Sequence, residues 1–305
     1  MSGLAASHRV ETFRAVAASS SAPLNVKVDL APILEAAHFE IQRAYAFMGL
    51  GTNAAEHDGL TQVHLPTAMR VQLLPKELSA DHVRQIKSEF RIWIASNGFR
   101  DLVEGFSRYL DQIFEAACIM MCATGAVRAS NVPQAVKRFA PKGLLDKLVL
   151  LDQEFGINTS LARFFSAFWS AQNCLSRRRG LVGEEDVSEH GRLTIKWRGF
   201  DLIAQASDGA ETLIEIARRT PVRVDPGIRL IARNIDRERA FFPGEVIDFE
   251  PQELSEICWN AQVAVNEIHN STLAYARSLG LPISAAPPGT VSGPEAPCER
   301  ESEVQ

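Results

Sequence analysis

The feature that most constrains the fold is a long apolar stripe in the middle of the chain. Apolar side chains recur every three or four residues, at Leu102, Val103, Phe106, Leu110, Ile113, Phe114, Ala117 and Met121. This period places them on one face of an α-helix. A stripe of this width becomes stable only when other elements bury it, so the rest of the chain must supply them.

Further helices follow from the same period. Pro32 suits a first helical turn, and the period then runs to Gly49 and Gly51, which we expect to stop the helix. Residues 52–78 are expected to form a long connection. Ser79 or Asp81 can cap a second helix, and Asn97-Gly98 is expected to end it as an antiparallel neighbour of the central helix. The period predicts later helices opening at Pro133 and spanning about 142–155, 160–179 and 251–279.

Between the last two helices the period shifts toward two, which indicates β-structure. Residues 193–205 are predicted to form a hairpin around Gly199, and 239–249 a second hairpin around Pro243-Gly244. Two further strands are expected between them, separated by a turn at 225–227.

These elements predict a mainly α protein, a helical bundle with a small β-rich insertion before the C-terminal helix. We expect one domain over residues 29–283, with the insertion at 193–249. Residues 1–28 and 284–305 are expected to be disordered tails, since the second is rich in Pro, Gly, Ser and Glu. An organelle transit peptide is the alternative for the first, which holds Ala, Ser and Arg.

Composition limits the classes of partner and compartment. The 305 residues carry a formal net charge of −5, so any phosphate-binding surface must be local. No run approaches 18 apolar residues, so we expect no membrane partner. An odd number of cysteines, five, scattered in apolar stretches, does not form a disulfide framework and favours a cytoplasmic protein with reduced thiols.

Four short patterns have a chemical and a structural explanation, and the structural one is favoured for each. Gly49 to Ala54 resembles a dinucleotide loop, but a helix precedes it where a strand is needed. Glu35 and His38 have the spacing of half a di-iron site, and no second copy exists. Cys118 and Cys122 lack a matching metal-ligating pair. The acidic run 184–186 suits a solvated loop better than a cation site. We therefore expect neither a metal nor a cofactor.

The segment from Gln172 to Val182, QNCLSRRRGLV, is the most informative for function. It resembles the signature region of HEPN-type helical domains, in which an Arg, often followed by Asn, precedes a His by four to six residues. The Gly and aliphatic pair that follow in many relatives match Gly180-Leu181-Val182. The resemblance covers roughly residues 80–280, and it implies a helical fold that often pairs as a homodimer and cleaves RNA without metal.

This chain departs from that pattern at both catalytic positions. Gln172 stands where the Arg is expected, and Arg177 stands where the His is expected. A guanidinium stays protonated and cannot act as a general base. The resemblance therefore implies a non-catalytic or residual HEPN-like module that binds RNA, a nucleotide or a protein partner.

The candidate binding residues are Asn173, Arg177, Arg178 and Arg179, which could clamp a phosphate. Cations in the last helical turn also complement the helix dipole, so a purely structural role stays open. Two alternative functions remain. One is a structural or regulatory interaction protein without nucleic acid, and the other is a metal-independent ribonuclease using Arg177 with His190 or His269.

Overall fold

The computed structural model describes residues 28–57, 78–214 and 228–282. The predicted tails lie outside these residues apart from Val28, as do most of the connection expected at 52–78 and the turn expected at 225–227. Within them, the chain is mainly helical with a small antiparallel sheet before the last helix, which confirms the predicted fold class.

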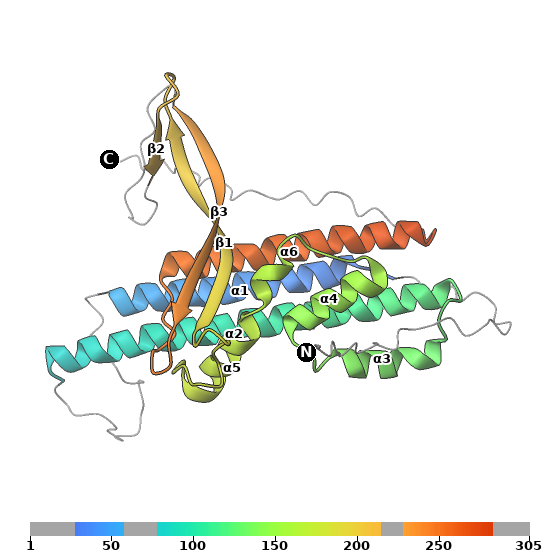
Figure 1. Cartoon of the computed structure of the whole chain (residues 1–305), viewed down its shortest axis with the longest axis horizontal. Coiled ribbons are helices and arrows are strands. Elements are labelled where there is room, and N and C mark those ends of the chain that lie inside the picture. The colour runs from blue at the N-terminus through green and yellow to red at the C-terminus, as the bar shows by residue number, and fades with distance from the viewer. Residues whose placement is uncertain (1–27, 58–77, 215–227, 283–305) are drawn as a thin grey trace, which may run out of the picture.

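Three long helices form one side of the molecule (Figure 1). They are α1 (Ala31–Glu56), α2 (Ala80–Ala123) and α6 (Pro251–Ser278). The shorter helices α3 (Val132–Phe139), α4 (Leu144–Phe155) and α5 (Phe168–Arg178) lie along α2. Two 3₁₀ turns, at Ala129–Asn131 and Ala162–Phe165, connect them. The central apolar stripe of the sequence is buried between these layers, with Leu110 and Ile113 fully enclosed.

The predicted break at Asn97-Gly98 is wrong, because α2 runs unbroken through it for 44 residues. Gly98 is buried, and a Cβ there would collide with the side chain of Met48 on α1. Gly51 has the matching role on α1, where a Cβ would collide with Ile94, and α1 continues past it to Glu56. Both glycines therefore allow close approach of two antiparallel helices and do not end either one.

The helix predicted at 160–179 is also divided. Residues 162–165 form a 3₁₀ turn, and α5 begins only at Phe168. Glu267 of α6 accepts the Ser160 N–H at 2.8 Å and the Thr159 hydroxyl at 2.5 Å. These bonds hold the start of the segment in a turn, so the α-helix begins further along the chain.

The sheet has the order β2-β1-β3, with β1 (Leu193–Gln205) in the centre, β2 (Glu211–Ile214) on one side and β3 (Arg229–Phe241) on the other. The predicted hairpin at Gly199 is wrong, since β1 is one continuous strand paired with β3 from Leu193↔Phe241 to Gln205↔Arg229. The turn at Pro243-Gly244 is present, but Val246 beyond it forms only an isolated bridge with Leu181. The two long strands rise out of the helical body as a narrow projection (Figure 1).

Candidate functional site

The predicted arginine cluster lies at the C-terminus of α5, and its three members have different surroundings. Arg178 forms ion pairs with Glu185 and Asp186 and also donates to the Leu181 carbonyl at 3.3 Å. Asp186 is buried and also accepts the Gly183 N–H at 2.9 Å. Asp186 is therefore a buried ion-pair partner, which corrects the interpretation of residues 184–186 as a solvated loop. Arg178 is a structural tie and not a free phosphate ligand.

Arg177 and Arg179 are exposed, and within the described ranges no ion pair engages either of them. Arg179 ends α5 in the left-handed conformation with φ +55°, where glycine is usual. A side chain in this region costs roughly 1 kcal/mol or more. Asn173 lies one helical turn before Arg177, so the two side chains share a face of α5. The structure thus leaves the Arg177 and Arg179 side chains exposed, places Asn173 on the face of α5 that carries Arg177, and engages Arg178 in ion pairs.

The two histidines considered for catalysis are not joined to this cluster. His190 is exposed in the loop after Asp186, and His269 belongs to α6. Burial lowers the pKa of His269, and the neighbouring His38 on α1 lowers it further. No hydrogen bond or ion pair among the described residues links either histidine to Arg177. His38 is half-buried, and its Nε2 donates to the side-chain oxygen of Asn266 at 3.0 Å, so this histidine has a protein partner.

The four described cysteines are free and buried, as predicted. Burial raises the pKa of the Cys118 and Cys258 thiols to about 12 and of Cys174 to about 11. Thiols of this kind remain protonated and unreactive near neutral pH. A small hollow beside Cys118 and Glu154 has a volume of about 10 Å³, which is no larger than one water needs.

Within residues 28–57, 78–214 and 228–282, no three His, Cys, Asp or Glu side chains gather closely enough to hold a metal ion. None of the helices in those ranges is both long and apolar enough to cross a membrane.

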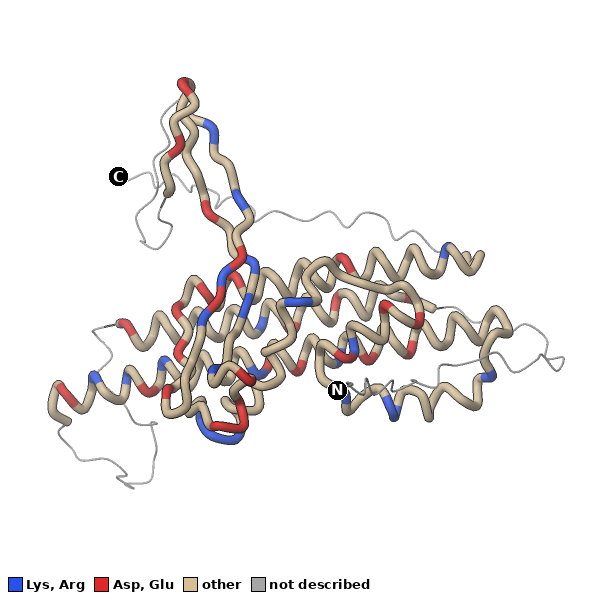
Figure 2. Tube along the Cα trace, in the orientation of Figure 1, with Lys and Arg blue, Asp and Glu red and all other residues tan. Residues whose placement is uncertain are grey.

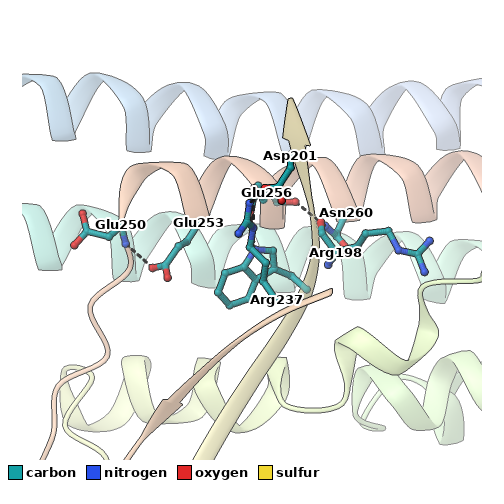
Figure 3. A network of polar contacts seen from close by, with 8 residues as sticks. Arg198, Asp201, Arg237, Glu250, Glu253, Glu256 and Asn260 are labelled. Atoms are coloured by element: carbon teal, nitrogen blue, oxygen red, sulfur yellow. Dashed lines mark hydrogen bonds and ion pairs between the residues drawn. The ribbon is translucent and has the colours of Figure 1, made fainter. Parts of the chain in front are cut away.

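The most developed polar arrangement is one that the sequence did not single out. It joins the lower part of β1 and β3 to α6 (Figure 3). Glu256, only 3% exposed, accepts the Trp197 indole N–H at 2.7 Å and pairs with Arg237 at 3.0 Å. Arg237 also pairs with Asp201 at 2.8 Å. Glu256 is the buried charge of this network, and Arg237 and Asp201 are half-buried. A buried carboxylate with such partners favours one geometry of the sheet on the helix.

Asn260, one turn after Glu256, completes this network. Its side-chain oxygen accepts the Arg198 N–H at 3.0 Å, and its NH₂ group donates to the Arg198 carbonyl and to the Glu256 carbonyl at 2.7 Å. The amide thus satisfies backbone groups on the side of β1 that faces away from β3. Gly199 allows this approach, because a Cβ would collide with Arg237 and Glu256.

A sequence signal for this network exists. Glu256 and Asn260 are four residues apart and fall among the apolar residues Leu254, Ile257 and Ala261 of α6. Polar residues inside a buried stripe need hydrogen-bond partners. Their hydrogen-bond partners come from a strand some 60 residues earlier in the chain. The sequence therefore indicates that Glu256 and Asn260 need partners but not which residues those partners are.

This network divides the sheet into two parts. The base, residues 193–201 and 233–241, is anchored on α6. The arm, residues 202–214 and 228–232, extends beyond the helices (Figure 1). Leu213 and Leu230 of the arm are 58% and 46% exposed.

Comparisons with known proteins found no related protein. No family model matches the chain, and neither the characterised proteins nor the solved structures contain a significant match. The resemblance to HEPN-type domains stays a prediction, and the functional proposal below is argued from the geometry alone.

Proposed function

We propose that this chain is a non-catalytic interaction protein that binds a protein partner through the arm. The observation that carries the proposal is the contrast within one sheet. The base is held by the Glu256–Arg237–Asp201 network, in which Glu256 is buried, while the arm stands away from the body. A rigid anchor lowers the entropy that a projecting element loses when it binds.

The apolar surface of the arm supports this proposal. Strand register places Leu213 on one face of the sheet beside Ile203 and Ile231, and Leu230 on the opposite face beside Ala204. Large apolar side chains exposed on both faces are unusual in a sheet that has water as its only neighbour. A partner that clasps the arm would bury both.

The charges of the arm favour a protein over a polyanion. Figure 2 shows both signs on the projection, with acidic residues at its tip and on the β1 and β2 side and basic residues on the β3 side. Glu211 of the arm forms an ion pair with Arg233, the first base residue of β3, at 2.9 Å, so the basic residue next to the arm is already neutralised. Nucleic acid binding depends on unpaired Lys and Arg along a common surface. The described part of the arm does not present such a surface.

The proposal can be tested with a matched pair of variants. The double variant Leu213→Ser/Leu230→Ser removes the exposed apolar groups of the arm, and Val149→Ser on α4, 41% exposed, is the control on the body. Tagged chains are cross-linked in an extract of the protein's own cells, and bound proteins are identified by mass spectrometry. We expect the same partner with wild type and Val149→Ser and its loss with the double variant. Recovery of that partner by all three chains would contradict the proposal.

A second candidate function is phosphate or RNA binding at Asn173, Arg177 and Arg179. The observation that favours it is Arg179, which adopts a costly left-handed conformation and stays without an ion-pair partner in the described structure. Function is one reason for a protein to retain such a residue. Arg178 is excluded from this candidate site because Glu185 and Asp186 occupy its guanidinium.

This candidate is tested by fluorescence anisotropy with a labelled single-stranded RNA. The variant Arg177→Ser/Arg179→Ser is compared with Lys137→Ser/Arg138→Ser on α3, which removes the same charge from exposed positions elsewhere. Salt-dependent binding that only the first variant weakens would support the site. Equal weakening by both variants would indicate non-specific attraction, and no binding by wild type would exclude RNA.

A further inference from the structure

The two long strands of the sheet differ in what lies beside them. The order β2-β1-β3 places β1 in the centre and β3 at one side of the sheet. On the side of β1 that faces away from β3, Asn260 bonds the backbone of Arg198 and β2 pairs with residues 202–205. On the far side of β3, no strand pairs with it within the described ranges. The outer side of β1 is therefore covered, and that of β3 is open.

The backbone of Arg198 shows which groups of β3 point outward. Its N–H and carbonyl bond to Asn260 on α6, so the pair Arg198↔Asp236 shares no hydrogen bond between the strands. Bonded and non-bonded pairs alternate along an antiparallel ladder. Every second residue of β3 before Asp236 therefore turns its N–H and carbonyl away from β1. These residues are Asn234, Ala232 and Leu230.

The turn between β1 and β2 gives the same orientation independently. The Ala206 N–H donates to the Ala210 carbonyl at 2.9 Å, toward β2. By the same alternation, Ala204 bonds to β2 and turns its backbone groups away from its β3 partner, Leu230. The outward direction of the Leu230 N–H and carbonyl thus follows from both ends of β1.

We call the outward N–H and carbonyl groups of Leu230, Ala232 and Asn234 the free edge. Within residues 28–57, 78–214 and 228–282, no hydrogen bond engages these groups, and all three residues are exposed. Proteins commonly protect such an edge with a β-bulge, a proline or a lysine. Pairing of β3 with β1 is one-to-one over its whole length, which excludes a bulge, and β3 contains neither Pro nor Lys. The free edge is therefore an unprotected template for a further strand.

The side chains beside the free edge indicate what kind of strand fits. A strand added there places its side chains alternately on the two faces of the sheet. It meets Leu230, 46% exposed, on one face and Ile235, 38% exposed, on the other. Arg233, on the face of Ile235, is already paired with Glu211. The free edge thus suits an uncharged strand with apolar side chains on both faces.

We propose that the partner protein bound by the arm donates an extended strand to the free edge. The proposal rests on the function proposed for the arm and specifies its partner. A polypeptide strand offers donors and acceptors in alternation at the spacing of the free edge, whereas phosphate groups offer acceptors alone. Backbone bonds to the free edge supply affinity, and the alternating side chains supply specificity. Strand addition also explains how one partner reaches apolar groups on both faces of the sheet.

The first test uses the full chain and a labelled probe peptide, Lys-Thr-Val-Ile-Val-Thr-Lys, blocked at both ends. A copy that is N-methylated at every Thr, Val and Ile keeps the side chains but loses the central N–H donors. Fluorescence anisotropy measures binding of both peptides. We expect the chain to bind the probe and not the methylated copy. Equal binding of both peptides would overturn the proposal, and so would a probe that stays unbound at the highest soluble concentration of the chain.

The second test removes a donor from the chain itself. Ala232→Pro deletes the central N–H of the free edge, and proline is tolerated on an edge strand where its N–H would face solvent. Ala232→Ser changes the same residue and keeps the N–H. We expect Ala232→Pro to weaken probe binding at least about 10-fold and Ala232→Ser to bind as wild type does. Circular dichroism and the melting temperature report folding. Equal binding by two folded variants would contradict the proposal, and the methylated peptide decides on wild type if Ala232→Pro does not fold.

Cross-linking in extract separates this proposal from the function proposed for the arm. We expect the partner that Leu213→Ser/Leu230→Ser loses to be lost by Ala232→Pro and kept by Ala232→Ser. A partner kept by Ala232→Pro would mean that the arm binds through side chains alone, which overturns strand addition and leaves the proposed function standing. Recovery of every partner by Leu213→Ser/Leu230→Ser would instead contradict the proposed function, while loss of probe binding in Ala232→Pro would still support strand addition.

A second copy of the chain is the other strand donor that the experiment can detect. Sedimentation of wild type and Ala232→Pro over a range of concentration measures self-association. A wild-type dimer that Ala232→Pro abolishes would assign the free edge to a second copy and overturn the proposal of a separate partner. We expect the two chains to sediment alike.

Discussion

The base and the arm are formed by the same two long strands but differ in what holds them. In the base, Leu193, Ile195 and Trp197 of β1 are at most 3% exposed, and polar groups of α6 satisfy the strand. Among the described residues of the arm, Ile203 is the one large apolar side chain that is buried. Leu213 and Leu230 face solvent. Strand pairing continues through both parts, so hydrogen bonding between strands does not distinguish them. The two parts differ instead in their contact with α6.

A polar network around one buried carboxylate, Glu256, holds one half of the sheet and leaves the other half free of the helix. A small isolated sheet is marginal in water, and packing against a helix stabilises it. Here the packing is confined to one half, and the other half is carried by continuity of β1 and β3. The protein can therefore place an exposed apolar element outside its body without losing strand register.

The largest expected effect comes from removing the central side chain of the base. Trp197 is 1% exposed, so Trp197→Ala should lower the free energy of unfolding by about 3–5 kcal/mol. Trp259→Ala removes an indole that is 36% exposed and should cost clearly less. Chemical denaturation of both variants measures the difference. Equal losses would mean that the base is not specifically anchored.

Removing the amide that joins α6 to β1 should have the next largest effect. Asn260→Ala leaves the Arg198 N–H and carbonyl without their side-chain partner, at a cost of about 2–3 kcal/mol. Asn270→Ala on the same helix changes an exposed residue and should be neutral or slightly stabilising. The urea midpoints of the two variants measure this difference. An unchanged midpoint for Asn260→Ala would mean that the network does not stabilise the base.

A smaller effect is expected from pH, and it should arise in the helical body rather than in the arm. The pKa of His269 is lowered in the folded chain, by burial first and by His38 second. The unfolded chain then binds a proton more readily, so stability should fall as pH decreases through the ordinary histidine range near 6.5 toward the lowered value. His269→Gln should remove this part of the dependence, and His38→Gln should reduce it. Melting temperatures measured from pH 8 to 5 test the sign, and stability that rises on acidification would contradict it.

The smallest effect on stability is expected in the arm. Leu213→Ser and Leu230→Ser change exposed side chains and should alter the free energy of unfolding by no more than about 0.5 kcal/mol each. Denaturation curves that overlay wild type are the expected result. A loss comparable to that of Asn260→Ala would show that these leucines belong to a core, and the arm would no longer be available as a binding element.

The sequence predicted the helices well because their apolar period is long, as in residues 102–121. The turns predicted at two glycines were wrong. Gly98 and Gly199 carry the local signal of a turn, but both lie inside straight elements where another part of the chain approaches. Local sequence contains no information about that approach, which depends on Met48 in one place and on Arg237 and Glu256 in the other.

The candidate sites show the same limit. The arginine cluster was visible as a run, yet its division into a tied Arg178 and exposed Arg177 and Arg179 depends on the loop that returns Asp186 to the helix end. The network at the base was signalled only by Glu256 and Asn260 within an apolar stripe. The exposure of Leu213 and Leu230 could not be predicted, because alternation of apolar residues does not say which half of a sheet a helix will cover.

The most direct test of the account is native-state hydrogen exchange along β1. We expect the paired amides of the base, residues 193–199, to exchange only through global unfolding. The paired amides at residues 203–205 should exchange through local opening at a much lower free energy. Protection that is uniform from Leu193 to Gln205 would contradict the division into an anchored base and a separate arm.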